Sequence, residues 1–189
     1  MHSDRQSAVF LTLDKLTRQL AALKVTYAVA GGLAVFFHGY RRFAEDVDIL
    51  LTREGLQRFH KHLDELGYEP LSSSNRKLRD RELGVRIQLL VCGDFPGDGK
   101  PKPVAFPDPS DARIERDGIQ WLDLPSLIDV KLASGIAVPA RLRDLADVQE
   151  LIRVLKLPED FSLDLEAFVR EKYVDLWDAA QEGPWEYPD

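Results

Sequence analysis

Cysteine is almost absent from the 189-residue sequence, which contains only Cys92. A single cysteine cannot form an internal disulfide, and this scarcity is typical of a chain that works in a reducing compartment. The sequence also has no apolar run near the roughly 18–20 residues that cross a bilayer, and its N-terminal segment lacks the apolar core of a signal peptide. These absences predict a cytoplasmic protein that does not act in a membrane.

An excess of positive charge is missing as well, because 25 Lys and Arg residues face 32 Asp and Glu residues, giving a formal net charge of −7. We therefore do not expect general electrostatic binding of nucleic acid, although a local basic patch can still contact phosphates. The hydrophobic fraction is 44%, which is enough for a buried core. The length suits one domain, or one domain with a helical extension.

Apolar periodicity and turn residues predict a mixed sheet followed by helices. The expected helices are 8–23, 32–40, 53–66, 125–134, 140–156 and about 163–181, and the expected strands or short apolar runs are 25–30, 46–51, 68–71, 85–92 and 118–122. Proline and glycine make residues 93–110 an irregular loop. We expect a core over residues 1–124 and a helical C-terminal subdomain over residues 125–189.

The most informative pattern is Gly31-Gly32, then a short helix, then Asp46-Val47-Asp48 on a predicted strand. Positions 46 and 48 share one face of a strand, where two unpaired carboxylates repel each other and are costly to bury. A divalent cation resolves that cost, and Mg²⁺ takes carboxylate oxygens together with substrate phosphates. A Gly-Gly turn lets backbone N–H groups approach a phosphate. The joint pattern predicts a site for a metal ion and a phosphate-bearing ligand.

The segments Ala30–Ala34 and Arg42–Leu50 resemble the nucleotidyltransferase superfamily, which has the polymerase-β-like fold. Within it, the sequence is most similar to stand-alone bacterial nucleotidyltransferases of the AbiEii type, the toxins of toxin–antitoxin systems. The segments Leu127–Leu132 and Arg143–Val148 resemble helices of that group. The resemblance implies an α/β (α+β) fold, a twisted mixed sheet flanked by helices with a C-terminal helical extension. It also implies an antitoxin-like protein partner.

The same resemblance implies a reaction and its site residues. A nucleoside monophosphate passes from an NTP, such as ATP, to an acceptor hydroxyl on tRNA, a protein side chain or a small molecule. Asp46 and Asp48 are implied ligands of Mg²⁺ or Mn²⁺, and Gly31 and Gly32 are implied to face the triphosphate. Identification of the nucleotide and the acceptor lies beyond this pattern.

Two cations are candidates for holding phosphates, namely Arg42, just before the Asp-x-Asp strand, and Lys131, in the first C-terminal helix. The alternatives are a solvated loop arginine and a lysine whose stem snorkels along the surface. Asp144 and Asp147 lie one helical turn apart, and we expect them to pair with the arginines next to them.

The third carboxylate of the family, on a neighbouring strand, is missing: the aligned stretch Arg86–Leu90 has Gln88 in its place. An uncharged amide cannot take a proton at neutral pH, so its presence is expected to impair transfer more than nucleotide binding. Asp94, Asp80 or Glu82 are alternative carboxylates, and a shift of the alignment by one strand is another explanation. Three functions stay open: an active transferase, a catalytically weakened nucleotide-binding module, and a pure interaction partner.

Overall fold

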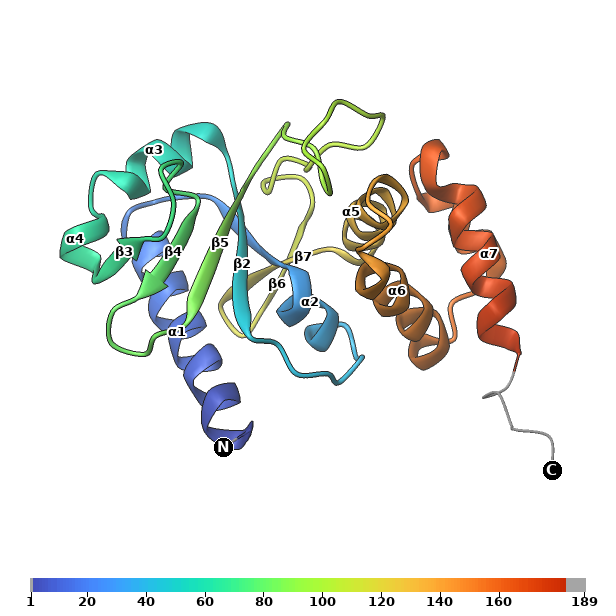
Figure 1. Ribbon diagram of the computed structural model, residues 1–189, viewed down its shortest axis with the longest axis horizontal. Coiled ribbons are helices and arrows are strands. Elements are labelled where there is room, and N and C mark those ends of the chain that lie inside the picture. The colour runs from blue at the N-terminus through green and yellow to red at the C-terminus, as the bar shows by residue number, and fades with distance from the viewer. Residues whose placement is uncertain (1, 183–189) are drawn as a thin grey trace.

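The computed structural model describes residues 2–182 and contains a seven-stranded mixed sheet (Figure 1). The strand order is β3-β4-β5-β2-β1-β7-β6. Neighbouring strands pair antiparallel except β2 with β5 and β1 with β7, which are parallel. The strands are β1 (Tyr27–Ala30), β2 (Asp46–Leu51), β3 (Tyr68–Pro70), β4 (Lys77–Asp80), β5 (Arg86–Val91), β6 (Arg113–Arg116) and β7 (Ile119–Leu122).

Helices cover both faces of this sheet. One face packs against α1 (His2–Ala22), α3 (Arg53–His60) and α4 (Leu63–Leu66). The other face packs against α2 (Gly31–Phe37) and α5 (Leu124–Ala137). Outward from α5 follow α6 (Leu142–Leu155) and α7 (Arg170–Gln181), with two 3₁₀ turns (Glu159–Asp164 and Ala167–Val169) between them (Figure 1). Over residues 2–182, no helix has both the length and the apolar character to cross a lipid bilayer.

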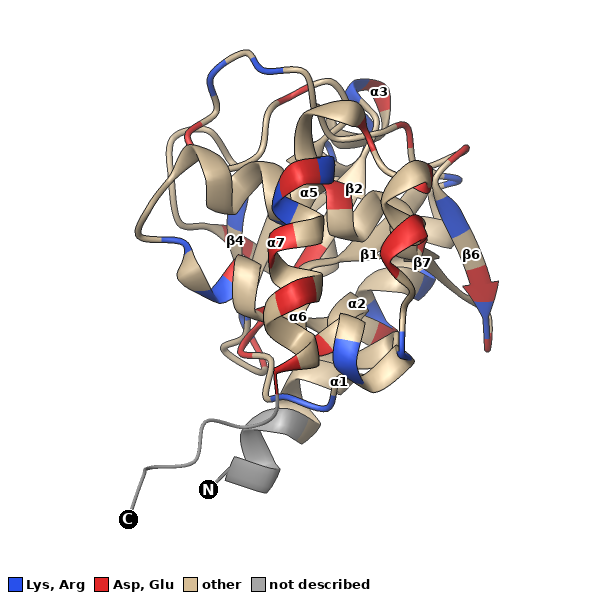
Figure 2. Cartoon of the chain, turned by 90° about the vertical axis from the view of Figure 1, so that its right-hand side faces the viewer, with Lys and Arg blue, Asp and Glu red and all other residues tan. Residues whose placement is uncertain are grey.

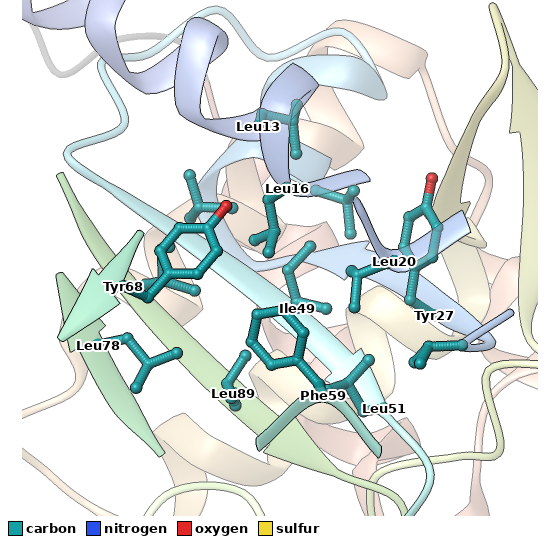
Figure 3. Packing of buried hydrophobic residues seen from close by; sticks show 14 of the residues in the cluster. Leu13, Leu16, Leu20, Tyr27, Ile49, Leu51, Phe59, Tyr68, Leu78 and Leu89 are labelled. Carbon is teal, nitrogen blue, oxygen red and sulfur yellow. The ribbon is translucent and has the colours of Figure 1, made fainter. Parts of the chain in front are cut away.

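The largest core lies between α1 and the sheet (Figure 3). Leu13, Leu16 and Leu20 recur at helical spacing along α1 and are at most 1% exposed. They pack against inward-facing strand residues such as Ile49 and Leu89. Each buried leucine stabilises the fold by about 1.5–3 kcal/mol relative to an exposed one, so this stripe fixes which face of β2 and β5 points away from solvent.

Local signals in the sequence explain several element boundaries. The Thr52 hydroxyl accepts a hydrogen bond from the N–H of Gly55 at 3.0 Å, which caps α3 as the sequence predicts. Gly67 has a φ of 86° and ends α4 in the left-handed conformation. The predicted helix 53–66 is therefore confirmed in extent, but it breaks near Lys61 and His62 into α3 and α4.

Two strands and one helix start differ from the sequence-based prediction. The strands β4 and β6 were not predicted, because each has a single apolar residue among charged ones, and all four β6 residues are exposed. The predicted helix at about 163–181 begins only at Arg170, because residues 159–169 form the two 3₁₀ turns. The predicted boundary near residue 124 coincides with the start of α5, and the division into two units stays a prediction.

The loop 93–110 has no helix or strand and lies between β5 and α5 (Figure 1). Its Lys102 ammonium donates to the carbonyls of Pro96 and Lys100 and to the Asp98 carboxylate, at 2.7–2.8 Å. Gly97, with a φ of +80°, sits against α5, where an added Cβ would lie 3.1 Å from the carbonyl oxygen of Ser134. The loop is thus an ordered connection, stabilised by the hydrogen bonds of its own Lys102.

One acidic residue of α5 gives a pH-dependent stability. Burial raises the pKa of Asp129 to about 7, against a partial opposing effect of the hydrogen bond from the N–H of Glu166 at 3.0 Å. From about pH 4 to about pH 7 the folded chain keeps a proton that the unfolded chain releases, so the free energy of unfolding falls as pH rises. We expect Asp129→Asn, which keeps an acceptor oxygen, to be more stable than wild type at pH 8 and nearly equal to it at pH 4.

Urea unfolding across this pH range measures the effect. The exposed Glu171→Gln serves as a control and should keep the wild-type pH slope. An Asp129→Asn variant with an unchanged pH slope would contradict the assignment.

Candidate active site

The two carboxylates of β2 lie on the face of the sheet that packs against α2 and α5. Val47 and Ile49 point into the core under α1, so Asp46 and Asp48, which alternate with them, point the opposite way. Both aspartates line a cavity of about 960 Å³, which also contains Gly31 and Gly32. The structure therefore brings together the two halves of the pattern that the sequence predicts to act jointly.

Gly31, the first residue of the glycine pair, is required by its close approach to Asp48. Gly31 has a φ of +58°, and a Cβ on it would lie 1.7 Å from Oδ2 of Asp48. Only glycine fits this position without a shift of the strand or the turn. The N–H of Gly32 donates to the Asp48 carboxylate. A Cβ on Gly32 would lie 3.1 Å from both terminal nitrogens of Arg42. The glycine turn therefore lies between the carboxylate of Asp48 and the guanidinium of Arg42.

The electrostatic environment of Asp48 favours a bound cation. Burial raises the pKa of Asp48, and the carboxylates of Asp46 and Asp144 raise it further, while Lys131 and the N–H of Gly32 lower it. A pKa above the ordinary value means that the ionised form is poorly stabilised by the protein alone. A positive ion beside Asp48 would supply the missing stabilisation.

The oxygen donors fit a magnesium ion that shares its ligands with a substrate. Among the side chains of residues 7–182 no cluster of three or more His, Cys, Asp or Glu is arranged to hold a metal. The site instead offers two carboxylates, Asp46 and Asp48. Mg²⁺ is commonly held by one or two carboxylates plus substrate phosphates and water. The donor set thus suits a metal that arrives with a phosphate-bearing ligand better than a permanent structural metal.

Gln88 lies beside Asp48 on the neighbouring strand. The parallel register of β2 and β5 pairs Asp46 with Arg86 and Asp48 with Gln88. Gln88 lines the same cavity as the two aspartates. Its amide makes one long contact, from Nε2 to the carbonyl of Leu89 at 3.5 Å. The position at which the resemblance implies a third carboxylate is therefore occupied by a neutral side chain.

Of the three alternative carboxylates, only Asp94 lies at the cavity that Gln88 lines. Asp80 is completely buried toward α1, where Lys15 contacts it at 3.1 Å. Glu82 lies 3.9 Å from the same lysine. Asp94 lines the cavity, but it pairs with the guanidinium of Arg76. Two of the three thus belong to the opposite side of the sheet, and the third already has a cationic partner.

Lys131 is buried, so the alternative of a snorkelling surface lysine is wrong. Its side chain is 6% exposed, and its Nζ contacts Asp144 at 2.9 Å and Asp147 at 2.7 Å. Asp147, which is 2% exposed, also accepts a hydrogen bond from Nη2 of Arg42 at 2.8 Å, and Nε of Arg42 lies 2.6 Å from its other oxygen. The main partners of Asp147 are therefore distant in sequence, in contrast to the predicted pairing with adjacent arginines.

Asp144 completes this ion network and partly confirms the sequence-based expectation. Its carboxylate contacts Arg141 at 3.1 Å and accepts the Ser134 hydroxyl at 2.7 Å. Burial acts to raise the pKa of Asp144, but Lys131, Ser134 and Arg141 together hold it below the ordinary value. Figure 2 views the molecule from the side that carries α6 and α7 and shows acidic and basic positions interspersed over it. The network connects the loop before β2, which carries Arg42, with α5 and α6.

Arg42, Lys131, Arg141 and Asp144 line the same cavity as Gly31, Gly32, Asp46, Asp48 and Gln88. Two further lining residues, Arg76 and Lys77, were missed by the sequence analysis. The signal that would have found them is the alternation of Leu78 with charged neighbours, which marks β4 as a half-buried strand.

Comparisons with known proteins bear on the fold. No protein-family model matches the sequence, and no curated protein matches it either. Among solved structures, the chain is similar to an antigenic nucleotidyltransferase-like protein from Paracoccidioides brasiliensis, at 18% identity and a TM-score of 0.50, over 95% of this chain and 93% of that one. ANT(2″)-Ia in complex with adenylyl-2″-tobramycin matches at 12% identity and a TM-score of 0.48, over 90% of this chain and 97% of that one.

At these identities the likeness establishes the fold. The chain has the mixed α/β architecture of nucleotidyltransferase-like proteins, with a seven-stranded mixed sheet flanked by helices. The predicted fold class, with helices α5 to α7 following the sheet, is confirmed.

Proposed function

We propose that the chain is a nucleotidyltransferase that binds an NTP such as ATP together with Mg²⁺ or Mn²⁺, and transfers its nucleoside monophosphate to an acceptor hydroxyl. The observation that carries this proposal is the packing of Gly31 directly against Asp48. This contact supports a single cavity in which a triphosphate meets both the glycine turn and the carboxylates of Asp46 and Asp48.

Each residue has a role in this proposal. Gly31 and Gly32 leave room for the triphosphate, and Arg42 and Lys131 offset its charge from the cavity wall. Both cations are tied to Asp147, which holds them in place before the nucleotide arrives. Asp46 and Asp48 would hold the metal, which supplies neutralisation of charge on the phosphate oxygens.

The transfer is an in-line displacement at the α-phosphorus. The acceptor oxygen forms a new P–O bond, the bond from the α-phosphorus to the bridging oxygen breaks, and pyrophosphate leaves with that electron pair. The acceptor proton goes to solvent water, because the amide of Gln88 cannot accept it. This chain contributes positioning and charge neutralisation rather than a base at that point.

A second candidate function is nucleotide binding without efficient transfer. The register that sets Gln88 beside Asp48, together with the orientation of Asp80 and Glu82 toward Lys15, favours it. The AbiEii-type assignment, with an antitoxin-like partner, rests on the sequence motifs alone. The acceptor on tRNA, a protein or a small molecule is likewise a proposal.

Thermal unfolding with each NTP, with and without Mg²⁺, tests the proposal. A ligand at about 100 times its dissociation constant stabilises the folded state by roughly 2.7 kcal/mol, which raises the melting temperature by roughly 5–10 °C for a domain of this size. We expect this rise for wild type with Mg²⁺ and at least one NTP, and none for the double variant Asp46→Asn/Asp48→Asn.

The control is Asp64→Asn, which removes a carboxylate that is 90% exposed on α4 and should respond like wild type. No rise with any NTP would refute nucleotide binding, and an equal rise in the double variant would place the nucleotide elsewhere. With no rise for any NTP, a role as an interaction partner becomes the leading function.

A further inference from the structure

Four charged residues form one row across the strands next to Asp48. The registers of β3 with β4, β4 with β5 and β5 with β2 align Glu69, Arg79, Arg86 and Asp46 in that order. Residues paired directly across neighbouring strands lie on the same face, with Cβ atoms about 4.5–5.5 Å apart. Two arginines are therefore directly paired in the centre of the row, an arrangement of like charges that destabilises a sheet.

The acids at the ends of the row satisfy the two arginines only in part. Arg79 lies 3.6 Å from Glu69 and makes no side-chain hydrogen bond to another described residue, whereas Arg86 donates one from Nε to Asp46 at 3.0 Å. Each guanidinium has five N–H donors. Their side chains are 47% and 59% exposed, so most of these donors face solvent. Such an arrangement suits a multivalent anion with several acceptor oxygens.

A hollow adjoins this arginine pair. Arg79 and Arg86 line a cavity of about 580 Å³, and Glu45 and Asp46 line both this cavity and the larger one described above. In the order β4-β5-β2-β1, the glycine turn follows β1 on one side of Asp46, and the two arginines lie on the other side. An in-line displacement needs the entering and leaving groups on opposite sides of the phosphorus. A phosphate held by the arginine pair would lie on the side of Asp46 away from the glycine turn.

Charge supports an anionic acceptor. The chain has a net charge of −7, yet Lys77, Arg79 and Arg86 share this face of β4 and β5. Lys77 is exposed, and no ion pair joins it to another of residues 2–182. Binding of a metal by Asp46 would also draw this carboxylate away from Arg86, leaving the pair with only Glu69 to offset it.

We propose that Arg79 and Arg86 form a binding site for a phosphate group of the acceptor, beside Asp46 and opposite the glycine turn. The acceptor class is thus a phosphate-bearing molecule with a free hydroxyl. The identification of this ligand as an acceptor rests on the proposed function, but the anion site itself is independent of nucleotide binding.

Binding of inorganic phosphate, measured by titration calorimetry on the full chain, tests the site. Arg79→Gln and Arg86→Gln are each expected to weaken binding about tenfold or more, since each removes charge-assisted hydrogen bonds. Arg113→Gln makes the same charge change on β6, at the far edge of the sheet, and should bind like wild type. Circular dichroism and melting temperature verify that each variant is folded.

Two further variants are expected to strengthen phosphate binding instead of weakening it. Glu69→Gln and Asp46→Asn each remove an acid from the end of the row and should tighten phosphate binding several-fold. Asp46→Asn is also expected to lose the Mg²⁺-dependent rise in melting temperature with NTP. One substitution should therefore weaken nucleotide binding and strengthen phosphate binding. Absence of the NTP shift from wild type with phosphate binding intact would refute the proposed function and leave the anion site standing.

The source of the phosphate is distinguished by two competitors, ribose 5-phosphate and a short single-stranded oligoribonucleotide. Displacement of inorganic phosphate by the sugar phosphate alone identifies a small phosphomonoester, and displacement by the oligonucleotide with a steep salt dependence identifies a nucleic-acid strand. The proposal is overturned if wild type does not bind phosphate, or if Arg79→Gln and Arg86→Gln bind it as wild type does.

Discussion

Replacing Asp147 with alanine should destabilise the protein by about 3–5 kcal/mol, because the change leaves two cations without their shared partner in a buried site. Asp147 is 2% exposed and contacts Arg42 at 2.6 Å and Lys131 at 2.7 Å. Lys131 is itself only 6% exposed, so without Asp147 its ammonium keeps one carboxylate partner, Asp144, and gains little contact with water. Urea unfolding at neutral pH measures the loss, and the melting temperature should fall by more than about 6 °C.

Two comparisons isolate the cause of that loss. Asp175→Ala breaks an ion pair with Lys172 of nearly the same length, 2.8 Å, but its carboxylate is 57% exposed. This control should cost at most about 1 kcal/mol. The double variant Lys131→Met/Asp147→Leu removes the buried lysine charge together with its partner and should be more stable than Asp147→Ala alone. A loss under about 1 kcal/mol for Asp147→Ala would show that the network contributes little to stability.

The same network has a consequence for the proposed nucleotide site. Arg42 approaches the Gly32 turn, and Lys131 acts electrostatically on Asp48. Asp147 holds both cations at the cavity wall although it does not line the cavity itself. A stability element between the sheet and the helices thus also fixes the positions of the charges that we propose to meet the triphosphate.

The sequence predicts best those parts of the fold whose signals are local. The run Asp46–Leu51 alternates charged and apolar side chains before it becomes fully apolar, and the predicted strand coincides with β2. Thr52 and Gly67 mark helix ends through their own side chain or backbone freedom. The Gly-Gly and Asp-x-Asp pattern also predicts which residues line one cavity. Their functional roles remain predictions.

What the sequence cannot supply is pairing between distant segments. Arg42 and Asp147 are 105 positions apart, and Lys15 and Asp80 are 65 apart. The packing of helices onto the sheet brings these charges together, and no local periodicity encodes it. The strand β4 was missed for a related reason: Leu78 is its only apolar residue, and its pairing with β5 is not encoded in the local sequence. The alignment of Arg79 with Arg86 follows from that register and not from their positions in the sequence.

The identity of residue 88 should decide how fast the chain transfers a nucleotide. Gln88→Asp places a carboxylate beside Asp48, at the position where an acceptor proton has no base in the wild type. General base catalysis contributes typically 10²–10⁴-fold, so we expect pyrophosphate release from Mg²⁺·NTP, with water as the acceptor, to rise by roughly that factor. The added charge should also strengthen Mg²⁺ binding, since a third carboxylate joins Asp46 and Asp48.

The matched control is Gln88→Asn, which has the shape of the aspartate variant without its charge and should leave the rate at the wild-type level. A gain in Gln88→Asp alone assigns the effect to the carboxylate and indicates that the wild-type site retains every other part of a transferase. Equal rates in both variants would show instead that the limit lies elsewhere, for example in the pairing of Asp46 with Arg86. If the ion pair between Asp46 and Arg86 sets the limit, Arg86 rather than Gln88 restrains the chemistry. Replacing Arg86 should then release Asp46 for the metal.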